Sequence, residues 1–318
     1  MTSQQTSDGL GRVHALVRDT FGLWDVNRVG FSWRNYYLEH TLRVRNLCLR
    51  LGREEGADRR LLDVAALLHD ITKRYDGGIL TDANGKRILD QFGFWRNELV
   101  LPARQNIVTR LYQHYDQFYE LHSLSGAKVG WSVLDLLGFS REFSDAVAEV
   151  VGAHVKPDKL DGHWLASAYR RPESRILCDA DTIDSNLGLV AFYRNVEIHT
   201  YHMVKRSGKA DLHAYVDSIP RWLQMKHDFL SKLMTDSGRR IGQERQQRNL
   251  DFCRLMLAEK DNFDLNRQYG LLGVFDYFMS RYEDPNLDEE MRHLAEVWIP
   301  ERRRLLEREP NPGARESL

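Results

Sequence analysis

Apolar residues recur along most of this chain at intervals of three and four positions, the spacing that places them on one face of an α-helix. Only 8 prolines interrupt the 318 residues, and no segment alternates polar and apolar residues in the manner of a strand. The pattern predicts helices over residues 36–51, 59–73, 101–119, 123–137, 141–154, 174–194, 219–235, 238–259, 266–282 and 288–307. We therefore expect an all-α protein with few strands.

Turn-forming residues separate these helices, at 76–78, 84–85, 157–162, 171–173 and 207–208. The stretch 77–94, rich in Gly, Asp and Asn, is predicted to be a loop suited to form one wall of a pocket. Residues 307–318 are expected to be frayed.

Composition and charge narrow the class of protein. The 45 basic and 46 acidic residues give a net charge of -1, so no global field favours nucleic acid or an anionic membrane. Cys48, Cys178 and Cys253 form no CxxC pair, which argues against a disulfide framework. The first residues lack a secretory signal pattern, and no apolar run approaches the roughly 20 residues that span a bilayer. We expect a cytoplasmic protein without membrane or nucleic-acid partners, and the sequence is compatible with a homo-oligomer.

The strongest chemical signal is LLDVAALLHDITK, residues 61–73. Its apolar residues leave almost no polar face, so this helix should be buried, yet it ends in His69 and Asp70. An ionised carboxylate in such a place needs a partner. A divalent cation would bind both side chains and keep the carboxylate charged. The alternative, usual for an isolated His–Asp pair, is a pair whose hydrogen bonds are satisfied at a helix end.

Three other histidines lie on apolar helix stripes. His40 follows the spacing of Val44 and Leu51, and His122 and His154 occupy comparable stripes on two later helices. One such histidine would usually be a satisfied core residue. Together with His69 and Asp70, they predict a metal-lined cavity between helices.

Three aspartates lie in an otherwise apolar helix in the segment SRILCDADTIDSNLGLVAFYRN. Asp181 shares a face with Asp184, whereas Asp179 points roughly the opposite way. Periodicity does not decide which of Asp179 and Asp181 faces the cavity. Pairing of one aspartate with Arg175 or Arg194 is the purely structural alternative.

The order H…HD…D, formed by His40, His69–Asp70 and Asp181, resembles the HD-domain metal-dependent phosphohydrolase superfamily. The resemblance runs from about residue 34 to residue 258. CDADTIDSNLGLVAF is similar to the DADRLDAIGAIG-type segment of the compact bacterial members. In the helix that follows, Thr235, Gly238 and Arg245 match the family pattern. The resemblance implies an HD-domain helical bundle with extra C-terminal helices: a hydrolase domain over 1–258 and a helical extension over 259–318 packed on the core.

The resemblance also implies a ligand set. His40, His69, Asp70 and Asp181 become the metal ligands, and the family pattern selects Asp181 over Asp179. His122 and His154 lie where larger HD proteins place two further histidines, and this six-residue set can hold two metals. We expect one or two divalent ions of Mn, Mg, Co, Fe or Ni.

From the same resemblance we expect hydrolysis of a phosphate ester or anhydride, with a nucleotide or related phosphorylated small molecule as substrate. Asp70, Lys73, His122 and His154 are the expected catalytic residues. Lys73, Arg43 and Asp184 are the expected substrate contacts, the two basic residues through phosphate. The insertion 74–121 and the sequence VKPDKLDG after His154, which lacks a GYP signature, depart from known subgroups.

Two other functions remain open. The six-residue ligand set also occurs in mixed-valent di-iron oxygenases resembling inositol oxygenase. The second alternative is a non-catalytic regulator that senses a nucleotide or binds RNA through arginine-rich patches. Those arginines lie near acidic residues and lack stacking aromatics, which favours a solvated helix face.

Overall fold

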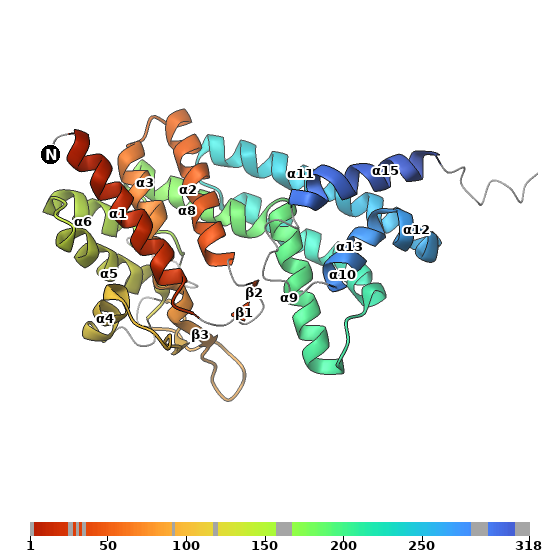
Figure 1. The fold of residues 1–318 in the computed structure, drawn as a ribbon, viewed down its shortest axis with the longest axis horizontal. Helices are drawn as coiled ribbons and strands as arrows, with labels where there is room; N and C mark the ends of the chain where they lie inside the picture. The colour runs from red at the N-terminus through yellow and green to blue at the C-terminus, as the bar shows by residue number, and fades with distance from the viewer. Residues whose placement is uncertain are drawn as a thin grey trace, which may run out of the picture. The chain divides into compact units, whose positions relative to one another are not determined.

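A computed structural model describes residues 3–24, 28–29, 32–33, 36–90, 93–116, 120–156, 167–280 and 292–308. Helices dominate this part of the chain (Figure 1), and its strands are few and short. The prediction of an all-α fold is confirmed. Among the helices described, none combines the length and the apolar content that crossing a membrane requires. The predicted turn at 157–162 and the tail from residue 309 lie outside the described residues.

The chain packs as two compact units that are not successive segments. The first unit comprises Met1–Val26, Asn35–Ser185 and Lys232–Ile241, and the second comprises Asn27–Arg34, Asn186–Ser231 and Gly242–Leu318. All of the candidate site residues belong to the first unit. The domain boundary expected at residue 258 stays a prediction.

The first unit is a bundle centred on α3. Its helices are α1 (Ser3–Phe21), α2 (Tyr36–Glu54), α3 (Arg59–Leu68), α4 (Ile107–His114), α5 (His122–Leu136), α6 (Arg141–Gly152) and most of α8 (Pro172–Asn186). α3 packs on α1, α2, α5 and α6, and α5 packs along α6. Every apolar residue of α3 is buried, as its sequence predicts. Asp58 caps this helix by accepting hydrogen bonds from the backbone N–H groups of Arg60 and Leu61.

Short strands extend the first unit beyond α3. A 3-10 helix, η1 (Lys73–Tyr75), leads into β3 (Asp76–Ile79), which pairs antiparallel with β4 (Asn97–Leu99). Asp76 lies opposite Leu99 in this pair. The predicted loop 77–94 therefore begins as a strand at its first residues.

The second unit has a core of aromatic rings. The ring of Phe192 lies 5.0 Å from Phe275, 5.1 Å from Phe252 and 5.5 Å from Trp222, measured between centroids. Its elements are β1 (Arg28–Val29), β2 (Ser32–Trp33), α9 (Leu189–Ser207), α10 (Leu212–His227), η2 (Asp228–Lys232), the greater part of α11 (Asp236–Ala258), η3 (Lys260–Asn262), α12 (Phe263–Tyr269), α13 (Leu271–Ser280), η4 (Leu294–Trp298) and α15 (Ile299–Arg308). β1 and β2 pair antiparallel.

Several helix boundaries differ from the prediction. The helix expected over 59–73 ends at Leu68, because the next hydrogen bonds, Ile71 N–H to Leu68 O and Lys73 N–H to Asp70 O, span three residues instead of four. The helix expected over 174–194 is two helices, broken where Gly188 adopts a φ of 92°. The helix expected over 101–119 is shorter, and residues 117–119 lie outside the described part.

Other differences concern elements that periodicity missed or merged. α1 was not predicted, since its glycines and polar residues lower its helix propensity; Val13 and Val17 are buried on its inner face. The helix expected over 219–235 begins earlier, at Leu212, and ends at His227. The helix expected over 266–282 is interrupted at Gly270, between α12 and α13.

Candidate metal centre

His40 projects from the buried face of α2 and is held by a charged pair behind it. Its Nδ1 lies 2.8 Å from Asp184 Oδ2, and Arg43 donates to the same carboxylate through Nε at 2.9 Å and Nη2 at 3.1 Å. Nε2 of His40 therefore points the other way, to 3.1 Å from Asp181 Oδ1. Burial opposes a charge on this ring, but Tyr36, Asp181 and Asp184 outweigh it and raise the pKa of His40 well above 6.5.

His69 and His154 are each held by a backbone carbonyl. Nδ1 of His69 donates to Ala66 O at 2.7 Å, and Nδ1 of His154 donates to Val151 O at 2.6 Å. A neutral imidazole that donates through Nδ1 carries its lone pair on Nε2. Burial lowers the pKa of His69 to about 4, so this ring is neutral near pH 7 and offers a lone pair.

His122, the first residue of α5, is oriented by Asp76. Its Nδ1 lies 2.7 Å from Asp76 Oδ2, and its Nε2 lies 3.4 Å from Asp70 Oδ1. Nζ of Lys73 lies 3.1 Å from the same Nδ1. Burial and the Lys73 charge lower the pKa of His122.

Asp70 lies between the four imidazoles, and each of its carboxylate oxygens faces two of them. Oδ2 is 3.6 Å from His40 Nε2 and 3.7 Å from His69 Nε2. Oδ1 is 3.4 Å from His122 Nε2 and 3.6 Å from His154 Nε2. Burial opposes its ionisation, but the histidines and Lys73 outweigh this and hold the pKa of Asp70 well below its usual value.

The atoms that could ligate a metal form two groups, His40 with His69 and Asp181, and Asp70 with His122 and His154; within each group they lie no more than 4.8 Å apart. Nε2 of His154 is buried and has no hydrogen-bond partner among the residues that the structure describes. Lone pairs and carboxylates that face one another without a cation are costly in a buried site. Imidazole nitrogen and carboxylate oxygen suit divalent first-row metals, and the outer hydrogen bonds orient the rings as ligating histidines require. The residues therefore fit a divalent metal.

The two aspartates that periodicity left open lie in different places. Asp181 faces His40, and although burial opposes its ionisation, His40 lowers the pKa of Asp181 to about 2. Asp179 accepts hydrogen bonds from the backbone N–H of Met234 and from both the N–H and Oγ1 of Thr235, just before α11. Asp179 therefore anchors the start of α11.

The structure brings most of the predicted site residues together. The six expected ligands and Lys73 converge, whereas Arg43 and Asp184 lie behind His40, with Asp184 fully buried. Asp76 was not anticipated from the sequence. Its one signal was an acidic residue in the turn that follows the His–Asp helix, and only the fold shows that it reaches His122.

Comparisons with known structures found several similar chains at low identity. A predicted HD superfamily hydrolase from an uncultured Thermotogales bacterium is 19% identical, with a TM-score of 0.43 over 78% of this chain and 91% of that one. YpgQ from Bacillus subtilis is 18% identical, with a TM-score of 0.46 over 80% of this chain and 97% of that one. A structure of YpgQ in complex with ADP is 17% identical, with a TM-score of 0.42 over 81% and 96%. Among curated proteins, no match was found.

A comparison with protein families found one informative match. Residues 37–186 match the family model of the HD domain. This segment contains all six expected ligands. The match and the two ligand groups together support a metal-dependent hydrolase. Residues 37–186 therefore form an HD domain.

Proposed function

We propose that the chain is a phosphohydrolase that cleaves a phosphate ester or anhydride at a centre of two divalent cations. The observation that carries this proposal is the two-sided environment of Asp70, whose two oxygens face different pairs of imidazoles. His40, His69, Asp181 and Asp70 Oδ2 would hold one cation. His122, His154 and Asp70 Oδ1 would hold the other.

The bound cations would supply the positive charge that polarises a phosphoryl oxygen and acidifies water. The rest of the chemistry depends on the protein's own side chains. Asp70 lies between the two ligand groups, so it can orient a water molecule on the side facing the substrate. Lys73, half-buried beside His122, supplies a further charge for developing negative oxygens.

Arg43 and Asp184 are better suited to positioning than to direct reaction. Asp184 is fully buried and holds Nδ1 of His40, so we propose that it orients this ligand and does not contact the substrate. The side chain of Arg43 is 23% exposed while it clamps Asp184. Its guanidinium is thus held in place and can still approach a phosphate.

Metal content and phosphate release test this proposal together. Protein purified and reloaded with Mn²⁺, Mg²⁺, Co²⁺, Ni²⁺ or Fe²⁺ is assayed for phosphate or pyrophosphate from nucleotides and simple phosphoesters. We expect two cations per chain, and at least a hundredfold lower activity for His69→Ala and Asp70→Ala. Lys209→Ala, an exposed lysine outside residues 37–186, serves as the control. Full activity in both ligand variants would contradict the proposal.

A second candidate function is a di-iron oxygenase. The second ligand group, Asp70 with His122 and His154, could hold the second iron that this function requires. Its signature would be two irons per chain and oxygen consumption with an organic substrate. Phosphate release by protein loaded with Mg²⁺ or Mn²⁺, without oxygen uptake, would decide for the phosphohydrolase.

A further inference from the structure

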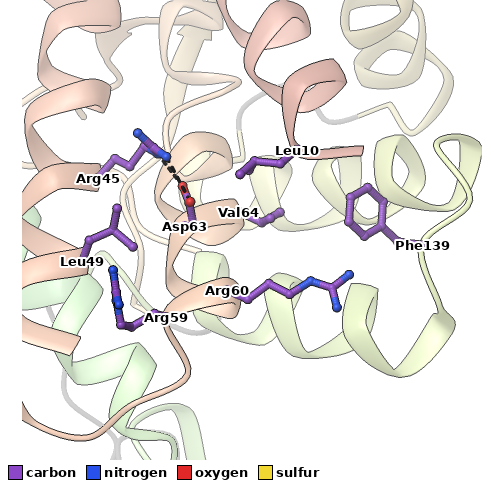
Figure 2. Close-up of a pocket in the computed structure, with 8 residues that line it drawn as sticks. All are labelled: Leu10, Arg45, Leu49, Arg59, Arg60, Asp63, Val64 and Phe139. Carbon is purple, nitrogen blue, oxygen red and sulfur yellow. Dashed lines mark hydrogen bonds and ion pairs between the residues drawn. The ribbon is translucent and has the colours of Figure 1, made fainter. Parts of the chain in front are cut away.

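The first unit contains a cavity that shares no residue with the candidate metal centre. It measures about 520 Å³ and lies between α1, α2, α3 and the turn that follows α5 (Figure 2). This volume is in the range of small-molecule sites, which are mostly apolar with a few polar groups that orient the ligand.

One part of the lining is apolar and comes from four separate segments. Val64 of α3 and Phe139 of the turn after α5 are buried. Leu10 of α1 and Leu49 of α2 are half-buried beside them. Because these side chains converge from different helices, they form a concave surface on which an apolar body could lose its contact with water.

The polar part of the lining has an excess of positive charge. Arg45 is neutralised by Asp63, to which it donates two hydrogen bonds (Figure 2). Arg59 and Arg60 form no ion pair with any residue that the structure describes, and the Arg60 guanidinium lies 4.8 Å from the ring centroid of Phe143. Within the described part of the chain, two guanidinium groups at the cavity thus have no acidic partner.

The position of these two arginines is not explained by helix stability. They begin α3, and the first turn of this helix contains no acidic residue. The amino end of a helix carries partial positive charge and favours anions, so two cations there oppose the dipole. The Asp58 carboxylate already caps the N–H groups of Arg60 and Leu61, so an anion at the cavity would be held by the guanidinium groups and not by the helix end.

We propose that this cavity binds a small amphiphilic organic anion. Its carboxylate or sulfonate group lies at Arg59 or at Arg60, whose side chains extend to opposite sides of the cavity (Figure 2), and its aliphatic or aromatic body lies against Val64, Leu49, Leu10 and Phe139. The site is independent of the proposed phosphohydrolase activity, since none of these residues is a candidate metal ligand.

The test is a fluorescence titration of the full chain with 8-anilinonaphthalene-1-sulfonate, followed by displacement with decanoate. We expect saturable binding of one probe per chain and displacement by decanoate at concentrations at least tenfold below those of neutral 1-decanol. The double variant Arg59→Gln with Arg60→Gln should weaken binding at least tenfold. Arg53→Gln, an exposed arginine of α2 outside the cavity, should leave it unchanged.

A second pair of variants tests the apolar part. Leu49→Trp should fill the cavity and weaken probe binding at least tenfold, whereas Leu136→Trp, at a position that is 61% exposed, should not. Circular dichroism of each variant checks that the fold is kept. Equal affinity in the arginine double variant, or equal displacement by decanoate and 1-decanol, would overturn the proposal. Probe binding should persist in His69→Ala, so a failure of the phosphohydrolase proposal would leave this result unaffected.

Discussion

At the scale of single residues, the centre depends on hydrogen bonds made by the far side of each imidazole. Each of the four rings uses Nδ1 for an outer partner, a carboxylate for His40 and His122 and a backbone carbonyl for His69 and His154. These bonds orient Nε2 toward the interior. Substitution of the residues behind the imidazoles should therefore weaken metal binding, as substitution of the candidate ligands should.

We predict that Asp76→Asn weakens the second cation selectively. The substitution keeps the shape of the side chain and removes the charge that holds His122 Nδ1, 2.7 Å away. Loss of such an outer partner typically costs about 10–100-fold in metal affinity. Isothermal titration with Mn²⁺ should show one strong site and one weakened site. Asp135→Asn, exposed on the same helix as His122, is the control, and two unweakened sites in Asp76→Asn would refute this role.

Substitution of Asp179 should affect the stability of the fold, whereas substitution of Asp181 should affect metal binding. Asp179→Ala leaves the N–H groups of Met234 and Thr235 without their acceptor, so we predict a loss of about 2–3 kcal/mol in the free energy of unfolding. Asp181→Ala should instead lower metal affinity with a smaller effect on the metal-free protein. Urea denaturation and metal titration of both variants measure this. The same phenotype in both would contradict the assignment of separate roles.

At the scale of elements, helix ends decide where the ligands lie. α3 stops at Leu68, so His69 and Asp70 lie in the tight turns that follow and not on a continuing helix face. The break at Gly188 similarly ends α8 just after the segment that contains Asp181 and Asp184.

We predict that Gly188→Ala destabilises the protein by about 1–3 kcal/mol, because its φ of 92° is strained for any residue with a Cβ. That Cβ would also lie 3.2 Å from Arg245 Cβ. Gly11→Ala is the matched control: it lies within α1 with open space around it, and should stabilise the protein by about 0.5–1 kcal/mol. Thermal unfolding measures both, and an unchanged stability for Gly188→Ala would show that the helix break does not depend on glycine.

At the scale of the whole molecule, the centre ties together segments far apart in sequence. Its candidate ligands come from α2, the turn after α3, α5, the turn after α6, and α8. A cation bound by all of them would stabilise the folded state over the unfolded one, in which the ligands are dispersed.

We therefore predict that removal of metal by a chelator lowers the unfolding temperature of the protein. Binding at a free metal concentration 100 times the dissociation constant contributes about 2.7 kcal/mol for one site. Differential scanning calorimetry with and without added Mn²⁺ checks this. In His69→Ala the difference in unfolding temperature with and without Mn²⁺ should shrink or vanish. An undiminished difference in that variant would show that the stabilising metal binds elsewhere.

The sequence by itself determined the helical class and indicated most of the candidate metal ligands. Apolar spacing marked the inner helix faces, and histidines or aspartates on those faces are costly unless a partner compensates them. Those signals are local, so they predicted α2, α5 and α6 closely, and they singled out His40, His69–Asp70, His122 and His154.

Only the tertiary structure decided how these parts meet. Asp179 and Asp181 are two residues apart on one helix, and their surroundings, the start of α11 and His40, come from distant segments. The contact of Asp76 with His122, the two-sided environment of Asp70 and the arginine-lined cavity likewise join segments that no periodicity connects. The physical reason is that spacing along a chain determines which face a residue occupies, whereas the partner on that face depends on packing between elements.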